Sequence, residues 1–298
     1  GSTLIPLFKS ENVRLNNVAS ISGLKAAHLA KRFGFSKSTS DLDSIFSDKK
    51  VGNLVIATRH DSHCPLVLKA LRKNMNVFVE KPLCLNLGEL QKIKRSFENI
   101  TKAPLLMVGF NRRFAPHIEK IKSMIKDIKE PKTFTMTVNA GPMELEHWVN
   151  DTKVGGGRVV GEVCHFIDLL RFLSNSPIVA HSSFQSRKSG DDTTSIYLEF
   201  LDGSIGNILY IANGSSKFPK ERLEVFTQGK VLQLDNYRKL KGFGWSNFKR
   251  MNLWKQDKGH KKCVRVFLES IRENKAHVIP FEEIVEVTKT TIELANTK

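Results

Sequence analysis

Short apolar segments alternate with amphipathic helical segments in the first third of this chain, and this alternation restricts the fold more than any other feature. The segments "GNLVIAT" (52–58), "NVFVE" (76–80) and "PLLMVGF" (104–110) are typical of buried β-strands. Helical periodicity fills the intervals at 63–74 and 87–100. Apolar strands separated by helices form parallel sheets that are covered on both faces. We therefore predict a doubly wound, Rossmann-like arrangement.

The segments before residue 52 continue the same alternation. We predict helices over 2–10 and 23–35, the second ended by Gly34, with a strand over 13–21 between them. Asp41 is a candidate N-cap for a short helix that follows it. These elements extend the predicted α/β unit to the start of the sequence.

The pattern changes after about residue 115. A long polar stretch, Gly141–Gly157, is followed by a predicted helix over 161–174 and then by consecutive strands with period-two alternation. The predicted strands are 133–140, 178–186, 193–201, 204–212, 222–228 and 230–235, and the predicted helices of this half are 116–128, 161–174, 261–274 and 281–296. This order indicates an α+β unit with an open, mostly antiparallel sheet. We predict two domains, 1–112 and 113–298, with the last helices packing back on the first domain.

Composition restricts the function classes. The 298 residues are 40% hydrophobic and 26% charged, and the four cysteines stand singly, which suits a reducing compartment and favours neither disulfides nor a metal site. No segment has the length of a membrane span, and the start lacks the pattern of a signal peptide. The net charge is +17, but the lysines are spread along the chain without a nucleic-acid-binding motif. We expect a cytoplasmic protein without membrane or nucleic-acid partners, whose charge favours anionic small molecules.

An acid and a base stand side by side at the end of the apolar strand predicted over 76–80. Val79 is followed at once by Glu80, Lys81 and Pro82. Strand ends are often charged, and a proline cannot continue a ladder, so a purely structural interpretation exists. The alternative is a functional site, because open α/β sheets bind ligands beyond the carboxyl ends of their strands.

Four motifs in order resemble the glucose–fructose oxidoreductase / inositol dehydrogenase (Gfo/Idh/MocA) family of nicotinamide-dependent oxidoreductases. They are "VIATRHDSHCPLVLKALRKNMNVFVEKPLCLNLGEL", "VGFNRRFAP", "GGGRVVGEVCHFIDLLRFL" and "KGHKKCVRVFLESIRENKAHVIPFEE". The similarity spans nearly the whole chain. It implies an enzyme that transfers hydride between NAD or NADP and a carbohydrate-like alcohol or ketone, and a homo-oligomer formed through the C-terminal sheet.

The resemblance also assigns site residues. It implies that Glu80 and Lys81 lie beside the nicotinamide, that Lys81 contacts the reacting hydroxyl, and that Thr58 and His63 lie near the cofactor. The chemistry suits a lysine, because oxygen gains negative charge as hydride leaves carbon and a cation stabilises that charge. A base must remove the hydroxyl proton. By resemblance, His165 carries this role.

Helical spacing places Glu162, His165 and Asp168 in one stripe along the margin of the apolar face of helix 161–174. The family pattern has an aspartate four residues before the histidine, where this chain has Gly161. That Glu162 replaces the missing acid is a hypothesis, and we also expect Asp168 to contact substrate. The alternative is a capped helix with ordinary polar surface residues.

The glycine-rich motif G-x-G-x-x-G that binds a dinucleotide pyrophosphate does not occur in this sequence. Either the sequence begins after that loop and its strand, or the protein has lost an ordinary cofactor site. We favour the first explanation because the other motifs are intact. Ser20 stands where an acid would bind the ribose of NAD, and Lys25 and Lys31 are near in sequence, so both NAD and NADP stay open.

Further candidates follow the predicted strand 104–110 or lie in the polar stretch 141–157. Asn111 and Arg113 could bind a substrate hydroxyl or carboxylate, although one arginine of the pair Arg112–Arg113 could equally form a salt bridge between domains. His147 and Trp148 could bind a sugar by stacking, or Trp148 could anchor a loop. The sequence thus predicts a sugar oxidoreductase. The alternative is a non-catalytic binding protein that keeps the fold without normal cofactor use.

Overall fold

The parallel strands of the first third form two short sheets. The computed structural model describes residues 3–144, 146–186, 191–275 and 277–296. One sheet pairs β1 (Asn17–Ala19) with β2 (Lys37–Thr39), and the other has the order β3 (Asn53–Ile56), β4 (Asn76–Val79) and β5 (Leu106–Val108). Every pairing in both sheets is parallel. The predicted Rossmann-like arrangement is confirmed.

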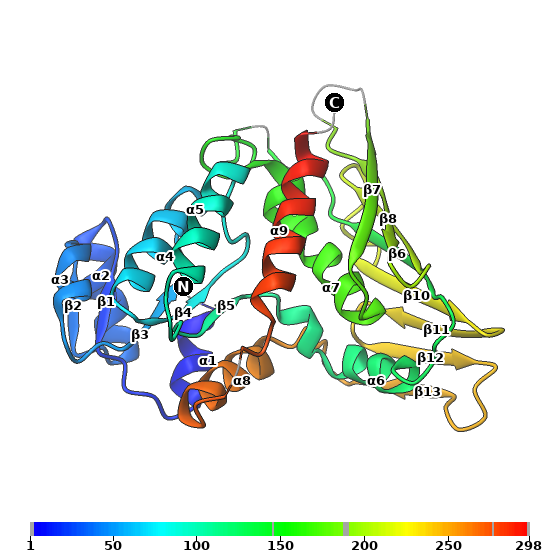
Figure 1. Ribbon diagram of the computed structural model, residues 1–298, viewed down its shortest axis with the longest axis horizontal. Helices are drawn as coiled ribbons and strands as arrows, with labels where there is room; N and C mark the ends of the chain where they lie inside the picture. Colours follow the sequence, from blue (N-terminus) through cyan, green and yellow to red (C-terminus); the bar gives the residue numbers. More distant parts are fainter. Residues whose placement is uncertain (1–2, 145, 187–190, 276, 297–298) are drawn as a thin grey trace.

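Helices cover both faces of the three-stranded sheet. The helices of this half are α1 (Leu4–Ser10), α2 (Gly23–Phe33), α3 (Leu42–Ser47), α4 (His63–Arg72) and α5 (Leu87–Glu98). Figure 1 shows α4 and α5 on one side of β4 and α1 on the other. On the α1 side, Phe78 of β4 meets Phe8 at 5.6 Å and Phe267 at 5.4 Å between ring centroids. The sheet is apolar along its length because it is covered twice.

Local signals set the ends of these helices as predicted. Gly34 ends α2 in the left-handed conformation, with φ of 82°. The side chain of Asp41 caps α3 by accepting a hydrogen bond from the backbone N–H of Asp43, and Asn86 caps α5 in the same way. Each cap satisfies an N–H that has no partner within its helix.

The second half contains an eight-stranded sheet. Its order is β13-β12-β11-β10-β6-β9-β8-β7, and every pair is antiparallel except β6 with β9. The strands are β6 (Thr133–Asn139), β7 (Ile178–Gln185), β8 (Thr194–Phe200), β9 (Ile205–Ile211), β10 (Glu221–Thr227), β11 (Lys230–Asp235), β12 (Lys239–Phe243) and β13 (Arg250–Asn252). The predicted mostly antiparallel sheet is confirmed.

The helices of the second half pack against this sheet or against the first half. They are α6 (Pro116–Ile125), α7 (Cys164–Ser174), α8 (His260–Arg272) and α9 (Phe281–Asn296), and short 3₁₀ and π turns precede α4, α6 and α7. Figure 1 shows α9 running between α5 and the large sheet, with α7 beside it and α8 next to α1. Phe97 of α5 stacks on Phe281 of α9 at 3.9 Å. None of the described helices is both long and apolar enough to cross a membrane.

Three short strands escaped the sequence prediction, and one was predicted too long. The chain from 13 to 21 is extended over Asn17–Ala19 alone. The strand β2 and the edge strands β12 and β13 were missed. These strands have three to five residues and carry Lys37, Lys239, Lys241, Arg250 or Asn252 at exposed positions, so they lack the apolar run on which strand prediction depends.

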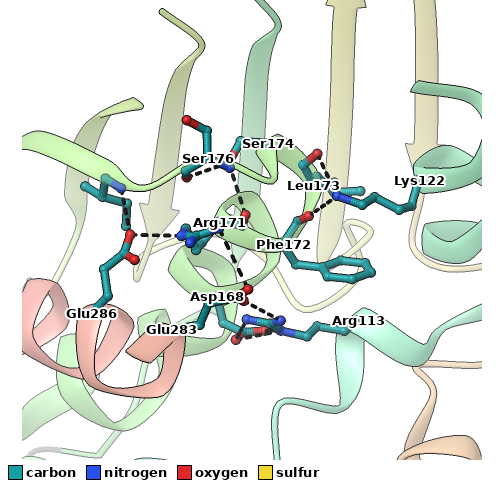
Figure 2. Close-up of polar contacts among 11 residues, drawn as sticks. Arg113, Lys122, Asp168, Arg171, Phe172, Leu173, Ser174, Ser176, Glu283 and Glu286 are labelled. Carbon is teal, nitrogen blue, oxygen red and sulfur yellow. Dashed lines mark hydrogen bonds and ion pairs between the residues drawn. The ribbon is translucent and has the colours of Figure 1, made fainter. Parts of the chain in front are cut away.

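A buried ion-pair network joins the crossover, α7 and α9 (Figure 2). Arg113 donates from Nε to Asp168 at 2.8 Å and from Nη1 to Glu283 at 2.8 Å. Arg171 donates to Glu286 at 2.9 Å. The side chains of Arg113 and Asp168 are 4% and 0% exposed, so this pair is held without water.

We expect Asp168→Asn to destabilise the protein. The change leaves Arg113 buried and short of one carboxylate, and breaking a buried pair costs about 3–5 kcal/mol of unfolding free energy. Urea unfolding monitored by circular dichroism measures the loss. The control is Glu98→Gln, which breaks the half-exposed pair of Glu98 with Lys94 and should cost under about 1 kcal/mol. Equal losses for the two variants would show that the buried pair contributes no more to the unfolding free energy than the half-exposed pair.

Candidate active site

The site begins at the carboxyl end of β4. The backbone N–H of Glu80 donates to Ile56 of β3, and that of Gly109 donates to Val79, so the strand tip is bound on both sides. The carboxylate of Glu80 lies over Gly109, where a Cβ atom would approach its Oε2 to 3.1 Å. Burial raises the pKa of Glu80. The next residue, Lys81, leaves the sheet and enters the space between the two halves.

Lys81 is held by the turn that precedes α7. Its Nζ donates to the carbonyl oxygen of Gly161 at 2.5 Å. Gly161 lies within a π-helical turn, Val159–Val163, which joins directly to α7. A π turn departs from the regular hydrogen-bond ladder of a helix and is often found at functional sites. This bond joins the first half of the chain to the second through the side chain of Lys81.

The polar stretch 141–157 folds over the carboxyl edge of the parallel sheet. His60 donates from Nδ1 to the carbonyl of Gly155 at 2.8 Å, and the ring of Trp148 contacts His60 with a centroid distance of 4.7 Å. Gly155 is required, because a Cβ atom there would lie 2.3 Å from the Cα of Val149. Glycine thus lets the two backbone segments approach closely. The stretch forms one wall of a cavity.

The cavity has a volume of about 340 Å³ and lies between the tip of β4, the turn into α7 and this polar stretch. Its lining residues are His60, Lys81, Arg112, Met143, His147, Trp148, Val149, Gly161, Glu162, His165, Phe166 and Lys220. The lining combines one aromatic wall with several convergent polar groups, which is the usual character of a small-molecule site. Within the described ranges, no cluster of three or more His, Cys, Asp or Glu side chains could hold a metal ion.

His165 lines this cavity and carries a buried nitrogen without a partner. It lies on the first turn of α7 and is 7% exposed, and its Nδ1 has no hydrogen-bond partner. Burial lowers the pKa of His165 well below 6.5, and the nearby cations Arg112 and Lys81 lower it further. The imidazole is therefore neutral at pH 7, which leaves a nitrogen able to accept a proton.

Arg112 lines the cavity and is fixed from behind. Its Nε and Nη2 both donate to Glu221 at 2.8 Å, and Lys258 donates to the same carboxylate at 2.7 Å. The guanidinium also lies over the ring of Phe166, 4.9 Å from its centroid. Burial alone raises the pKa of Glu221, but the two cations outweigh burial and hold that pKa at about 2.

The structure brings five of the predicted site residues together. Lys81, His147, Trp148, Glu162 and His165 all line the cavity. Two of these also contact each other, because the rings of His147 and Trp148 lie 5.8 Å apart.

Glu162 lies in the cavity wall but has a different neighbour from the one expected. Its Oε1 lies 3.6 Å from the Nε of Arg158, and the unpartnered Nδ1 of His165 shows that Glu162 does not bind that nitrogen. The π turn changes the angular spacing between residues 162 and 165, so helical spacing alone misplaces their side chains. The expectation that Glu162 orients His165 through this nitrogen is corrected.

Three predicted substrate contacts lie away from the cavity lining. Arg113 and Asp168 bind each other in the buried network of Figure 2, and burial raises the pKa of Asp168 to about 6 although Arg113 opposes the shift. Asn111 donates to the carbonyl of Lys258 at 2.6 Å. Both adjacent arginines form buried ion pairs, Arg112 with Glu221 and Arg113 with Asp168, and Arg112 also lines the cavity.

The residues predicted to bind cofactor lie along the carboxyl edges of the parallel strands. Ser20 follows β1, and Thr58 follows β3 and accepts a hydrogen bond from Ser62 at 2.6 Å. His63 is fully buried, and its Nδ1 donates to the carbonyl of Pro82 at 2.7 Å, while Nε2 lies 3.3 Å from the carbonyl oxygen of Thr58. Its ring is occupied by the protein backbone, so it supports the loops around Lys81.

The sequence does not assign His60 or Lys220 to the site, and it leaves open which of Arg112 and Arg113 binds a ligand, although all three of His60, Arg112 and Lys220 line the cavity. A signal existed only for Arg112, as one of two adjacent arginines at the crossover. Lys220 reaches the site because β10, which starts at the next residue, pairs with β6 in the large sheet.

Comparison with known proteins follows the two halves of the fold. The profile of the GFO_IDH_MocA oxidoreductase family, NAD-binding Rossmann fold, matches residues 1–110. The profile of the C-terminal alpha/beta domain of this family matches residues 118–292. The chain belongs to this family.

Two curated members and one solved structure show the range of similarity. Myo-inositol 2-dehydrogenase of Thermotoga maritima is 27% identical over 70% of this chain and 64% of its own length. Levoglucosan dehydrogenase of Pseudarthrobacter phenanthrenivorans is 29% identical over 50% of this chain and 39% of its own length. The chain thus spans less than two thirds of these relatives. A levoglucosan dehydrogenase structure in complex with NADH and levoglucosan superposes with a TM-score of 0.87 at 19% identity, covering 99% of this chain and 93% of the other.

The family's cofactor can be tested against the residues present. A nicotinamide and a hydroxylated substrate need a cation and a proton acceptor at one place, and the side chains of Lys81 and His165 line the same cavity. The residues present therefore fit the nicotinamide end of the cofactor.

The unfolding free energy at acid pH should depend on the contact between Arg112 and Glu221. A pKa held at about 2 instead of 4.5 corresponds to about 3 kcal/mol of unfolding free energy, which is present above pH 4.5 and is lost as the pH falls toward 2. We expect Glu221→Gln to be less stable than wild type at pH 7 and this gap to shrink between pH 4.5 and pH 2. Urea unfolding at several pH values measures both. A gap that stays constant over this range would show that Glu221 is not held ionised by Arg112 and Lys258.

Proposed function

We propose that this protein is an NAD(P)-dependent oxidoreductase that transfers hydride between nicotinamide and a carbohydrate-like alcohol or its ketone. The observation that carries the proposal is the meeting of Lys81 and His165 in one cavity at the carboxyl edge of the parallel sheet. Membership of the family supports it, as do relatives named as inositol and levoglucosan dehydrogenases.

Lys81 stabilises charge on the reacting oxygen. Bound nicotinamide supplies the hydride acceptor or donor. As the carbon–hydrogen bond breaks, negative charge develops on the substrate oxygen, and the ammonium of Lys81 lowers the energy of that state. Its bond to the Gly161 carbonyl fixes the ammonium before substrate binds, so little reorganisation is needed during the reaction.

His165 takes the hydroxyl proton during oxidation and returns it during reduction. The lowered pKa of His165 keeps the ring neutral at pH 7, so one of its two nitrogens can accept a proton. Phe110 packs at the edge of the ring with a centroid distance of 6.3 Å and restricts its orientation. In this proposal Trp148 and His147 contact the sugar ring, and Glu162 binds one of its hydroxyls.

The cofactor end of the site is proposed along β1 and β3. Ser20 and Thr58 would line the path of the dinucleotide, and Glu80 would shape its nicotinamide end beside Gly109. No acid lies between Asn12 and Ser40, so NADP is as acceptable as NAD at the ribose. We place the domain boundary at residues 112 and 113 and the protein in the cytoplasm.

Replacing Lys81 by alanine should abolish most turnover. Removing a charge-stabilising group of this kind costs a factor of about 100 to 1,000 in kcat. The assay follows NAD(P)H absorbance with inositols, free sugars and nucleotide sugars as candidate substrates. Lys73→Ala, at an exposed lysine after α4, is the matched control and should behave as wild type. Turnover by Lys81→Ala at the wild-type level would refute the role of Lys81.

The non-catalytic alternative makes a different prediction for the same experiment. A binding protein that had lost cofactor use would neither bind NAD(P)H nor turn over any substrate of the panel. The paired Lys81 and His165 favour the enzyme, because a binding protein needs no proton acceptor with a lowered pKa.

We also propose that the protein forms a homo-oligomer through the open face of the large sheet. Figure 1 shows α7 and α9 on one side of this sheet, and the other side carries exposed apolar side chains. These are Phe184, Tyr197, Leu209, Phe226 and Phe243. Large exposed apolar side chains on the open face of a sheet are a feature of interaction surfaces.

Leu209→Lys places a charge at the centre of this open face and should reduce the mass measured by sedimentation equilibrium to that of a single chain. Burying an unpaired charge in an interface is strongly unfavourable. A wild-type protein that is already a single chain would contradict the proposal.

A further inference from the structure

The charged groups of the cavity lining are mostly cations. Lys81, Arg112 and Lys220 line it, and the one acidic side chain among its described lining residues is Glu162. That carboxylate has its own cation nearby, since Arg158 lies 3.6 Å away. The lining therefore carries positive charge that Glu162 does not compensate.

The carboxylate behind the lining does not neutralise this positive charge. Glu221 has a side chain that is 0% exposed and is shared by two cations, Arg112 and Lys258. One carboxylate thus faces two positive charges. Because the side chain of Arg112 is 10% exposed and that of Lys258 is 17% exposed, water screens the excess charge only weakly.

Lys220 is a further cation of the cavity lining. It directly precedes Glu221, the first residue of β10 and the partner of Arg112. The backbone N–H of Asn139 donates to the carbonyl of Lys220 at 2.7 Å and fixes this point of the chain. Among the residues that the structure describes, the ammonium of Lys220 has no ion-pair partner.

A second requirement comes from His165. Its ring lines the cavity, and a neutral imidazole has one nitrogen that can accept a hydrogen bond from a hydroxyl. The cavity therefore suits a molecule with a hydroxyl at one place and a negative charge at another. Trp148 and His147 offer ring faces in the same wall.

We propose that the substrate is an anionic sugar derivative whose carboxylate or phosphate binds Arg112 and Lys220 while its reacting hydroxyl faces Lys81 and His165. This inference rests on the proposed oxidoreductase function. Arginine held in a fixed orientation is well suited to carboxylate and phosphate oxygens, and a lysine adds a second charge-assisted bond. A neutral polyol would leave the excess positive charge in place.

Calorimetric titration with three related sugars tests the inference without requiring turnover. Glucose is the neutral reference, glucuronate carries a carboxylate, and glucose 6-phosphate carries a phosphate. We expect at least one anionic sugar to bind about tenfold more tightly than glucose at low salt, with the advantage falling as salt is added. The tighter of the two anions identifies the group. Equal binding of all three sugars, or binding of none, would overturn the inference.

Two lysine variants locate the effect. Lys220→Gln should remove most of the preference for the anionic sugar over glucose. Lys217→Gln makes the same change of charge at an exposed lysine outside the lining and should keep the full preference. The same loss in both variants, or in neither, would overturn the assignment of Lys220.

Turnover is measured separately with NAD(P)H. An anion preference without turnover of any sugar would count against the oxidoreductase proposal and leave the anion site supported. Turnover without an anion preference would support the oxidoreductase proposal and count against the anion site. The two proposals can therefore fail independently.

Discussion

The bond from Lys81 to the carbonyl of Gly161 is the contact on which the site depends. It joins the tip of β4 to the π turn at the start of α7, and so it positions the cation and His165 relative to each other. The residues come from parts of the chain 80 positions apart. Neither half of the fold contains the cation and the proton acceptor together, so the cavity exists only where the halves meet.

Buried ion pairs make that meeting specific. The pairs of Arg112 with Glu221 and of Arg113 with Asp168 start at adjacent residues and reach different elements, β10 and α7. Losing one partner leaves a buried charge unpaired, which is strongly unfavourable, so Arg112 and Arg113 are held in place. The same arrangement that holds the halves together also turns Arg112 toward the cavity, where its charge is available to a ligand.

Much of the fold could be predicted from local patterns, and the cavity wall could not. Apolar runs identify β3, β4 and β5, and Gly34 and Asp41 mark helix ends, because these signals act within a few residues. The choice between Arg112 and Arg113 depends on where Glu221 and Asp168 lie after folding, and periodicity does not carry that information. The motif resemblance located Lys81 and His165, whereas Lys220 needed the sheet order.

Competitive acetylation of lysines, read by mass spectrometry, tests most directly whether ligands occupy this cavity. The protein is labelled alone, with NADH, and with NADH and a sugar that it binds. The account predicts that labelling of Lys81 falls sharply when both ligands are present, while labelling of the exposed Lys73 is unchanged. Equal labelling of Lys81 in all three states would contradict the claim that the site of reaction lies at the tip of β4.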